Sequence, residues 1–428
     1  MNSKTFLKIF TIAILQLTNA DKALSCSMYK ITYNGKTMVG CNHDTWLSTP
    51  RIWFETNGFG AAYTGARLDG DNGYAPQSGL NEFGLAFSRL AAPPPKYENV
   101  SSTKISITNP TLFLKEVLHK CKTVDEVKNY IDKYDHSSFS QDVFIYVDKS
   151  GKYLIVEPYK TTLGNDPKYV LANFCPSQIT NFSSIKQERY INGSAFLKNK
   201  IDTSLSFCKA LSDTMHVCRK KIGDGTLLTS IWNINDGIVY VYFYHDYKHV
   251  KQFNLKDELA KGDHAFELPN LFPPNEEFKK LVDYKTPLNS TTIDLFLRIC
   301  LGFYLFSALF FLFNYFKKRK TTQYSYLKLF LFPFNLIMMS YVFILGTELN
   351  IYYYPTPYKS YNSGLIDVIA YTPFLLALLI IPFIIINLKL LKTNAWKFTP
   401  KWLFTINNIV CIILICLFIY WGFYNVTN

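Results

Sequence analysis

The stretch from Cys26 to Trp46, C-S-M-Y-K-I-T-Y-N-G-K-T-M-V-G-C-N-H-D-T-W, decides how the first part of the chain folds. Two strand-forming segments flank Asn34-Gly35, the strongest short-range signal for a two-residue β-hairpin. The second segment returns along the first, so Asp44 comes back toward the strand start that carries Cys26. The sequence therefore predicts a sheet that begins at Cys26 with a carboxylate close to its first residue.

More strand pairs follow this hairpin, with a helical pattern between them. Alternating apolar residues predict a second hairpin at 143–147 and 153–156 and a third within 231–244, turning at 235–237. Residues 110–134 carry the apolar spacing of a helix. Strand pairs with helices between them indicate a layered α/β or α+β domain. We expect this domain to span residues 26–288.

The first 25 residues have the features of a secretory signal peptide. Lys4 and Lys8 precede an apolar run that is too short to cross a bilayer. Ala23 and Ser25 stand at the −3 and −1 positions of a cleavage site before Cys26. Two alternatives remain open at this point: an uncleaved anchor, and lipoprotein maturation, which would also make Cys26 the first residue.

The C-terminal part, residues 293–428, contains four apolar segments of about the ~20 residues that a membrane-spanning helix needs. They lie near residues 295–316, 327–345, 365–388 and 403–423. This part holds 11 basic and 3 acidic residues, so most of the net charge of +13 lies beside the apolar segments. Nine of these basic residues fall between spans one and two or between spans three and four. The positive-inside rule then predicts that the N-terminal domain and the C-terminus are outside the cytoplasm, and the charge indicates topology rather than nucleic-acid binding.

The nine cysteines show no C-x-x-C pair, so the sequence predicts no metal site and no cofactor. Cys26 is the informative cysteine. Cleavage after Ser25 would give it a free α-amine, whose reference pKa is near ~8 and which can accept a proton at neutral pH. A thiol beside that amine combines a nucleophile and a general base in one residue.

Several short segments downstream of Cys26 occur in a suggestive order. They are G-C-N-H-D at 40–44, Q-S-G-L-N-E-F-G-L-A-F-S at 77–88, Y-V-L-A-N-F-C at 169–175, E-R-Y at 188–190 and T-L-L-T-S-I-W-N-I-N-D-G-I-V-Y at 226–240. This order resembles the choloylglycine hydrolase family, the linear amide C–N hydrolases that include bile salt hydrolases and penicillin V acylases. The resemblance covers roughly residues 26–270 and stops before the apolar segments.

The resemblance implies an α+β chain: an N-terminal-nucleophile αββα four-layer sandwich, followed by an all-α four-helix transmembrane region. It also implies roles for five residues. Cys26 matches the nucleophile, and Asp44 matches the acid beside its amine. The backbone N–H of Asn81 and the side chain of Asn173 match the oxyanion donors, and Arg189 matches an arginine that orders the site.

One position departs from the bile salt hydrolases, which have an arginine where this chain has Cys41. Without that cation, the pKa and reactivity of the thiol differ from those of the family, and we do not carry over bile salts or penicillin V as substrates. His43 would point away from Asp44 if the strand continues, and we leave it out of the predicted site.

The sequence thus predicts an exported, membrane-anchored hydrolase that cleaves a small or lipid-like N-acyl amide through a thioester at Cys26. The predicted partners are this substrate and the membrane, without nucleic acid, and the oligomeric state stays open. The alternative is a non-catalytic exported binding or sensory membrane protein in which Cys26 is lipidated or inert.

Overall fold

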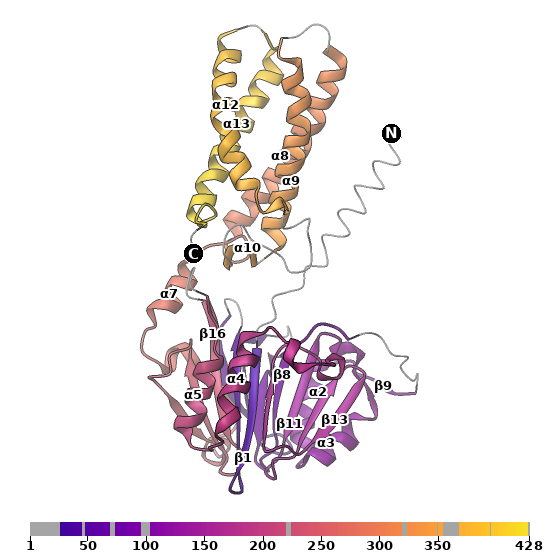
Figure 1. Cartoon of the computed structure of the whole chain (residues 1–428), viewed down its shortest axis with the longest axis vertical. Helices are drawn as coiled ribbons and strands as arrows, with labels where there is room; N and C mark the ends of the chain where they lie inside the picture. The colour runs from indigo at the N-terminus through magenta and orange to yellow at the C-terminus, as the bar shows by residue number, and fades with distance from the viewer. Residues whose placement is uncertain are drawn as a thin grey trace. The chain divides into compact units, whose positions relative to one another are not determined.

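The computed structural model describes residues 26–44, 48–68, 73–95, 103–219, 224–318, 323–348, 350–353, 368–393 and 395–426. The predicted signal peptide, residues 1–25, lies outside these described residues. The chain divides into two compact units, Leu24–Val282 and Asp283–Asn428, the second with Met1–Ala23. Figure 1 draws both, and each is described by itself below.

Two large antiparallel sheets form the N-terminal unit. In strand order, the first contains β14 (Lys168–Leu171), β1 (Cys26–Tyr33), β2 (Lys36–Asp44), β16 (Asp224–Asn233), β17 (Ile238–Phe243) and β18 (Lys251–Asn254), with β15 (Cys218–Arg219) beside β16. The second contains β13 (Lys160–Gly164), β12 (Tyr153–Glu157), β11 (Asp142–Val147), β8 (Ala86–Ala91), β7 (Ser78–Asn81), β4 (Ala61–Gly65), β3 (Arg51–Glu55) and β19 (His264–Glu267). Two short pairs complete the strands: β5 (Arg67–Leu68) with β6 (Tyr74–Ala75), and β9 (Ile105–Ser106) with β10 (Tyr134–Asp135).

The three predicted hairpins are confirmed. Asn34 and Gly35 have φ values of 50° and 73°, the left-handed pair that a tight two-residue turn between β1 and β2 requires. Strands β11 and β12 form the second hairpin, and β16 and β17 form the third. The helix predicted at 110–134 is in fact two helices, α2 (Pro110–Lys120) and α3 (Val124–Ile131), because Thr123 caps a new helix by accepting a hydrogen bond from the N–H of Glu126.

The sheets face each other, and helices cover their outer faces (Figure 1). Ser78 of the second sheet lies 3.1 Å from Ser230 of the first, between their hydroxyl oxygens. Helices α4 (Glu188–Asn199) and α5 (Leu205–Met215) pack on the first sheet through a core that includes Tyr29, Leu197 and Leu211. Helices α2 and α3 pack on the second sheet through a larger core. The predicted four-layer αββα sandwich is therefore confirmed.

Two further helices in this unit are short: α6 (Leu255–Leu259) and α7 (Glu276–Asp283). Helix α7 is held at the end of β17 by aromatic packing. The ring of Phe278 lies 4.8 Å from that of Phe243 and 5.2 Å from that of Tyr244, measured between centroids. This contact fixes where the acidic residues at the start of α7 lie.

The C-terminal unit is all-α, and four of its helices are long and apolar enough to cross a membrane. They are α8 (Thr291–Lys318), α9 (Ser325–Thr347), α12 (Thr372–Lys392) and α13 (Phe398–Tyr420), with a short α10 (Asn350–Tyr353) between the second and third. The third span was predicted from residue 365, and residues 365–367 lie outside the described part of the chain. Buried amides link these helices: Asn407 Nδ2 donates to Ser307 Oγ at 3.1 Å and to Asn335 Oδ1 at 2.5 Å.

Candidate active site

Cys26 is the first residue of β1, and its side chain is buried. Strand β14 pairs with β1 so that Leu171 lies opposite Met28. Continuing this antiparallel register by two residues brings Asn173 to Cys26. The backbone nitrogen of Cys26 donates to Asn173 Oδ1 at 2.8 Å, a contact between residues 147 positions apart.

Asn173 is the centre of a buried hydrogen-bond network. Its Oδ1 accepts a second hydrogen bond from Arg189 Nη2, and its Nδ2 donates to the carbonyl of Ala91 at 2.6 Å. Gln187 holds its backbone from both sides: the N–H of Asn173 donates to Gln187 Oε1 at 3.1 Å, and Gln187 Nε2 donates to the Asn173 carbonyl at 2.9 Å. The structure therefore brings together three of the predicted site residues, Cys26, Asn173 and Arg189.

Gln187 was not among the residues predicted for the site. Gln187 directly precedes α4 and lies two positions before Arg189. The start of α4 therefore places the side chains of both residues against Asn173. The proximity of Gln187 to the predicted E-R-Y segment was the only available signal. Its contact depends on how α4 packs beside β14, which no local pattern reveals.

His43 lies directly opposite Cys26 in the β1–β2 register. Opposite residues of an antiparallel pair share a face, with Cβ atoms ~4.5–5.5 Å apart. This face points toward the second sheet, because His43 Nε2 lies 3.1 Å from Ser78 Oγ. The Ser78 hydroxyl is bonded in turn to Thr64 at 2.6 Å. His43 therefore lies on the thiol's side of the sheet and, as predicted, on the face opposite to that of Asp44.

Cys41 occupies the same face as His43 but has a different character. Burial raises the pKa of its thiol to about 12, against the smaller lowering effect of hydroxyl groups from Ser88, Ser78 and Ser230. The nearby Cys26 raises the pKa a little further. Cys41 is thus a neutral thiol at physiological pH and supplies no cation beside Cys26.

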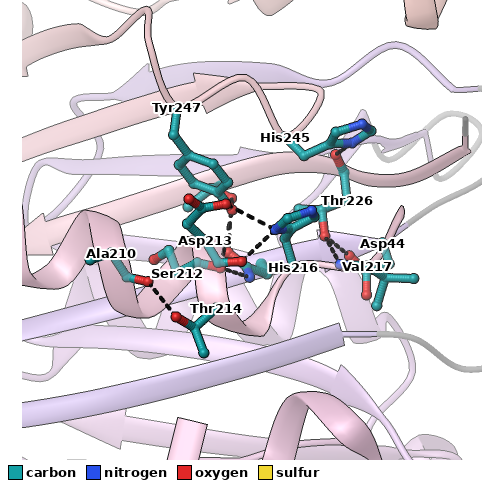
Figure 2. A network of polar contacts seen from close by, with 12 residues as sticks. Asp44, Ala210, Ser212, Asp213, Thr214, His216, Val217, Thr226, His245 and Tyr247 are labelled. Atoms are coloured by element: carbon teal, nitrogen blue, oxygen red, sulfur yellow. Dashed lines mark hydrogen bonds and ion pairs between the residues drawn. The ribbon is translucent and has the colours of Figure 1, made fainter. Parts of the chain in front are cut away.

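Asp44 ends β2 on the other face of the sheet, the one covered by α5. Its neighbour Asn42 shows this orientation by donating from Nδ2 to the Ser212 carbonyl of α5 at 2.9 Å. The carboxylate of Asp44 accepts a hydrogen bond from Thr226 Oγ1, and Thr226 Oγ1 accepts one from the Val217 N–H at 3.0 Å (Figure 2). Asp44 therefore lies at the predicted end of the strand, and its carboxylate is on the side opposite the thiol.

Asn81 is not brought to this network, and its predicted role is corrected here. Its backbone N–H donates to the Leu85 carbonyl at 3.0 Å inside the β7–β8 turn, so the donor expected at the oxyanion is already used. Its side-chain amide donates to the carbonyls of Leu118 and Cys121, both at 2.8 Å, on the helix-covered face of the second sheet. Ala91, which contacts Asn173, is at the opposite end of β8. At ~3.3 Å per residue, these two ends are ~17–20 Å apart.

Comparison with known proteins gives two solved structures of interest. The chain is similar to a variant of conjugated bile acid hydrolase from Clostridium perfringens, with 17% identity, 58% of this chain and 97% of that chain covered, and a TM-score of 0.43. It is similar to penicillin V acylase from Agrobacterium tumefaciens, with 14% identity, 57% and 91% covered, and a TM-score of 0.45. No protein-family model and no curated protein matches the chain.

Proposed function

We propose that this chain is a hydrolase of the choloylglycine hydrolase type that cleaves a linear, non-peptide amide through Cys26 as an N-terminal nucleophile. The observation that carries the proposal is the contact between the Cys26 nitrogen and Asn173 Oδ1 at 2.8 Å, on an oxygen that Arg189 also holds. After cleavage of the predicted signal peptide, this nitrogen is an α-amine with a reference pKa near ~8. An acceptor in this position holds the amine beside its own thiol.

The proposed reaction begins when the α-amine takes the proton of the Cys26 thiol. The thiolate attacks the amide carbonyl carbon, and the carbonyl oxygen becomes an oxyanion. The leaving amine takes the proton as the C–N bond breaks, which leaves a thioester on Cys26. Water then attacks the thioester with its proton passing to the α-amine, and the acid product and the thiol are released.

Asn173 is the proposed side-chain donor to the oxyanion. Its Nδ2 carries two hydrogens, and the Ala91 carbonyl accepts one of them. We assign the second hydrogen to the developing negative charge, where one such donor contributes ~3–4 kcal/mol. Arg189 and Gln187 act as positioning residues, because their hydrogen bonds fix the amide of Asn173. Asp44 is assigned to the amine side of Cys26, at the end of β2.

His43 is the proposed neighbour of the thiol that replaces the family's arginine. It faces the same inter-sheet space as Cys26, and its Nε2 is held at 3.1 Å from Ser78 Oγ. An imidazole in this position donates a hydrogen bond to a thiolate when its facing nitrogen is protonated. Cys41 has no such role because its thiol stays neutral.

The basic residues within 317–328 and 389–401 support an orientation with the N-terminal unit and the C-terminus outside the cytoplasm. An exported enzyme on four membrane-spanning helices suits a substrate delivered at a membrane, so the proposed substrate class is a small or lipid-like N-acyl amide.

The test combines intact mass with a substrate screen. The full chain is purified in detergent, the mass of its mature N-terminus is measured, and N-acyl amino acids, N-acyl amines and penicillin V are offered to it and to Cys26→Ser. We expect a mature chain that begins at an unmodified Cys26 and an amide hydrolysis that Cys26→Ser lacks. A diacylglyceryl group on Cys26 would instead establish the non-catalytic alternative, because it removes the thiol.

A further inference from the structure

A cluster of metal-ligand side chains lies outside the proposed active site, on the far side of Thr226 from Asp44. Cys218 Sγ, a ring nitrogen of His245 and a carboxylate oxygen of Glu277 all lie within 4.8 Å of one another. They come from three separate elements: β15, the segment after β17, and α7. Within the described residues, this is the one group of three or more such side chains that are close enough to share an ion.

We propose that Cys218, His245 and Glu277 bind a zinc ion. Thiolate, imidazole and carboxylate are the three ligand types that zinc takes in proteins, and three protein ligands leave one tetrahedral position open. Zinc bonds of ~2.0–2.3 Å place tetrahedral ligand atoms about 3.5 Å apart. Binding would therefore move His245 Nε2 and Glu277 Oε2, now 2.9 Å apart, slightly away from each other, and would bring any pair near the 4.8 Å limit closer together. The exposed side chains of Cys218 and Glu277 have the freedom to do this.

The ring of His245 is already oriented as a zinc ligand. Its Nδ1 faces the Thr226 carbonyl at 3.4 Å, and its Nε2 faces Glu277 Oε2 at 2.9 Å. Both of these partners accept hydrogen bonds, and a neutral imidazole has one hydrogen to donate. A zinc ion at Nε2 would leave that hydrogen on Nδ1, facing the Thr226 carbonyl, and would place its positive charge beside the Glu277 carboxylate. A backbone carbonyl on the other ring nitrogen is the usual support of a metal-bound histidine.

A second histidine–carboxylate pair in the described residues makes the same contacts without a cysteine. His264 has Nδ1 at 2.7 Å from the Gly262 carbonyl and Nε2 at 2.8 Å from Glu258 Oε2. That arrangement repeats the one at His245, but the neighbouring charged group is Lys261, a cation bonded to Glu258, rather than a cysteine. A lysine there repels a metal ion, whereas Cys218 supplies a ligand. The two pairs therefore differ in the one group that favours a metal ion, Cys218 beside His245 and Lys261 beside Glu258.

The site is connected to the end of β2. The backbone carbonyl of Thr226 lies beside His245, and the hydroxyl of the same residue donates to Asp44 (Figure 2). The ring of His216 stacks on that of His245 at 5.5 Å and 9°, from the loop that leads into Cys218. Zinc would thus hold β15, the segment after β17 and α7 together around Thr226. Binding replaces the Cys218 thiol proton, which is released to solvent, so affinity falls as the pH is lowered.

The experiment titrates the metal-free full chain in detergent with Zn²⁺ by calorimetry, and with Co²⁺ by absorption, since a cobalt–thiolate bond gives an ultraviolet charge-transfer band. The variants are Cys218→Ser, His245→Ala and Glu277→Gln, with His264→Ala as the control. We expect one Zn²⁺ per chain, a thiolate band with Co²⁺, and an affinity at least tenfold weaker in each site variant but unchanged in His264→Ala.

Thermal melts of the same proteins show whether they remain folded. Zn²⁺ should raise the melting temperature of the wild type and of His264→Ala equally, and should raise that of Cys218→Ser by less at the same Zn²⁺ concentration. Absence of binding by the wild type, binding of equal strength by Cys218→Ser, or a Co²⁺ spectrum without a thiolate band would each overturn the proposal. None of these measurements depends on amide hydrolysis, so they stand apart from the proposed function.

Discussion

Asn81 and Asn173 were both predicted to donate hydrogen bonds to the oxyanion, and they lie in different places. Asn173 follows β14, and its Oδ1 accepts a hydrogen bond from the backbone nitrogen of Cys26, the first residue of β1. Asn81 closes the β7–β8 turn, and its amide is fully used by four backbone groups. A short motif therefore predicts a residue's role only where the pairing of the strands also brings that residue next to Cys26.

The largest effect is expected from Cys26→Ala. Amide hydrolysis should be abolished while the thermal melt stays close to that of the wild type, because the change removes the nucleophile but only one small side chain. Hydrolysis of the best screened substrate is compared at equal protein concentration. Activity above a few per cent of wild type would show that the Asn173 region is not the reaction centre.

Asn173→Ala tests whether the Asn173 side chain donates to the oxyanion. We expect kcat to fall by ~10²–10³ with little change in KM, because the amide is proposed to donate mainly in the transition state. Steady-state kinetics on the same substrate measure both constants. A rise in KM at constant kcat would instead assign Asn173 to substrate binding.

His43→Gln should have an intermediate effect. Loss of one hydrogen bond to the thiolate costs ~1–1.5 kcal/mol, which corresponds to a decrease of about tenfold in kcat. An unchanged KM and an unchanged thermal melt distinguish this effect from a purely structural role. A Cys41→Ser control on the same face should leave kcat unchanged, because burial keeps the Cys41 thiol neutral.

Asn81→Ala should have the smallest effect on activity. We expect unchanged kcat and KM but a free energy of unfolding lower by ~1–3 kcal/mol, because the buried carbonyls of Leu118 and Cys121 lose their donor. Chemical denaturation and steady-state kinetics are measured on the same preparation. A decrease in kcat as large as that of Asn173→Ala would instead indicate that Asn81 contributes to catalysis.

Local patterns were sufficient for much of the fold. Asn34-Gly35 predicted the first hairpin, and a two-residue turn there also sets the register that pairs residue 26 with residue 43. The position of His43 opposite Cys26 could therefore have been predicted by extending this register to the start of β1. The break between α2 and α3 was missed because apolar spacing continues across Cys121 and hides the cap at Thr123.

The remaining parts of the site depend on contacts between distant segments. The pairing of β14 with β1 brings Asn173 to Cys26, and the packing of α4 beside β14 adds Gln187 and Arg189. Asn81 was misassigned for the same reason, since its partners at Leu118 and Cys121 belong to a helix end 37 and 40 residues away. The order of motifs identified the segments but not the geometry that joins them.

The central claim is that the α-amine of Cys26 is the base for its own thiol, and the free N-terminus tests it most directly. Two full chains are compared in detergent, one that begins at Cys26 and one with a single uncleavable Gly before it. Both should give the same thermal melt, because one residue is added at a terminus. The account predicts that only the first hydrolyses amides or becomes acylated on Cys26 by an activated ester, as measured by intact mass. Equal activity in both chains would contradict it and would make another group, with His43 the nearest, the base.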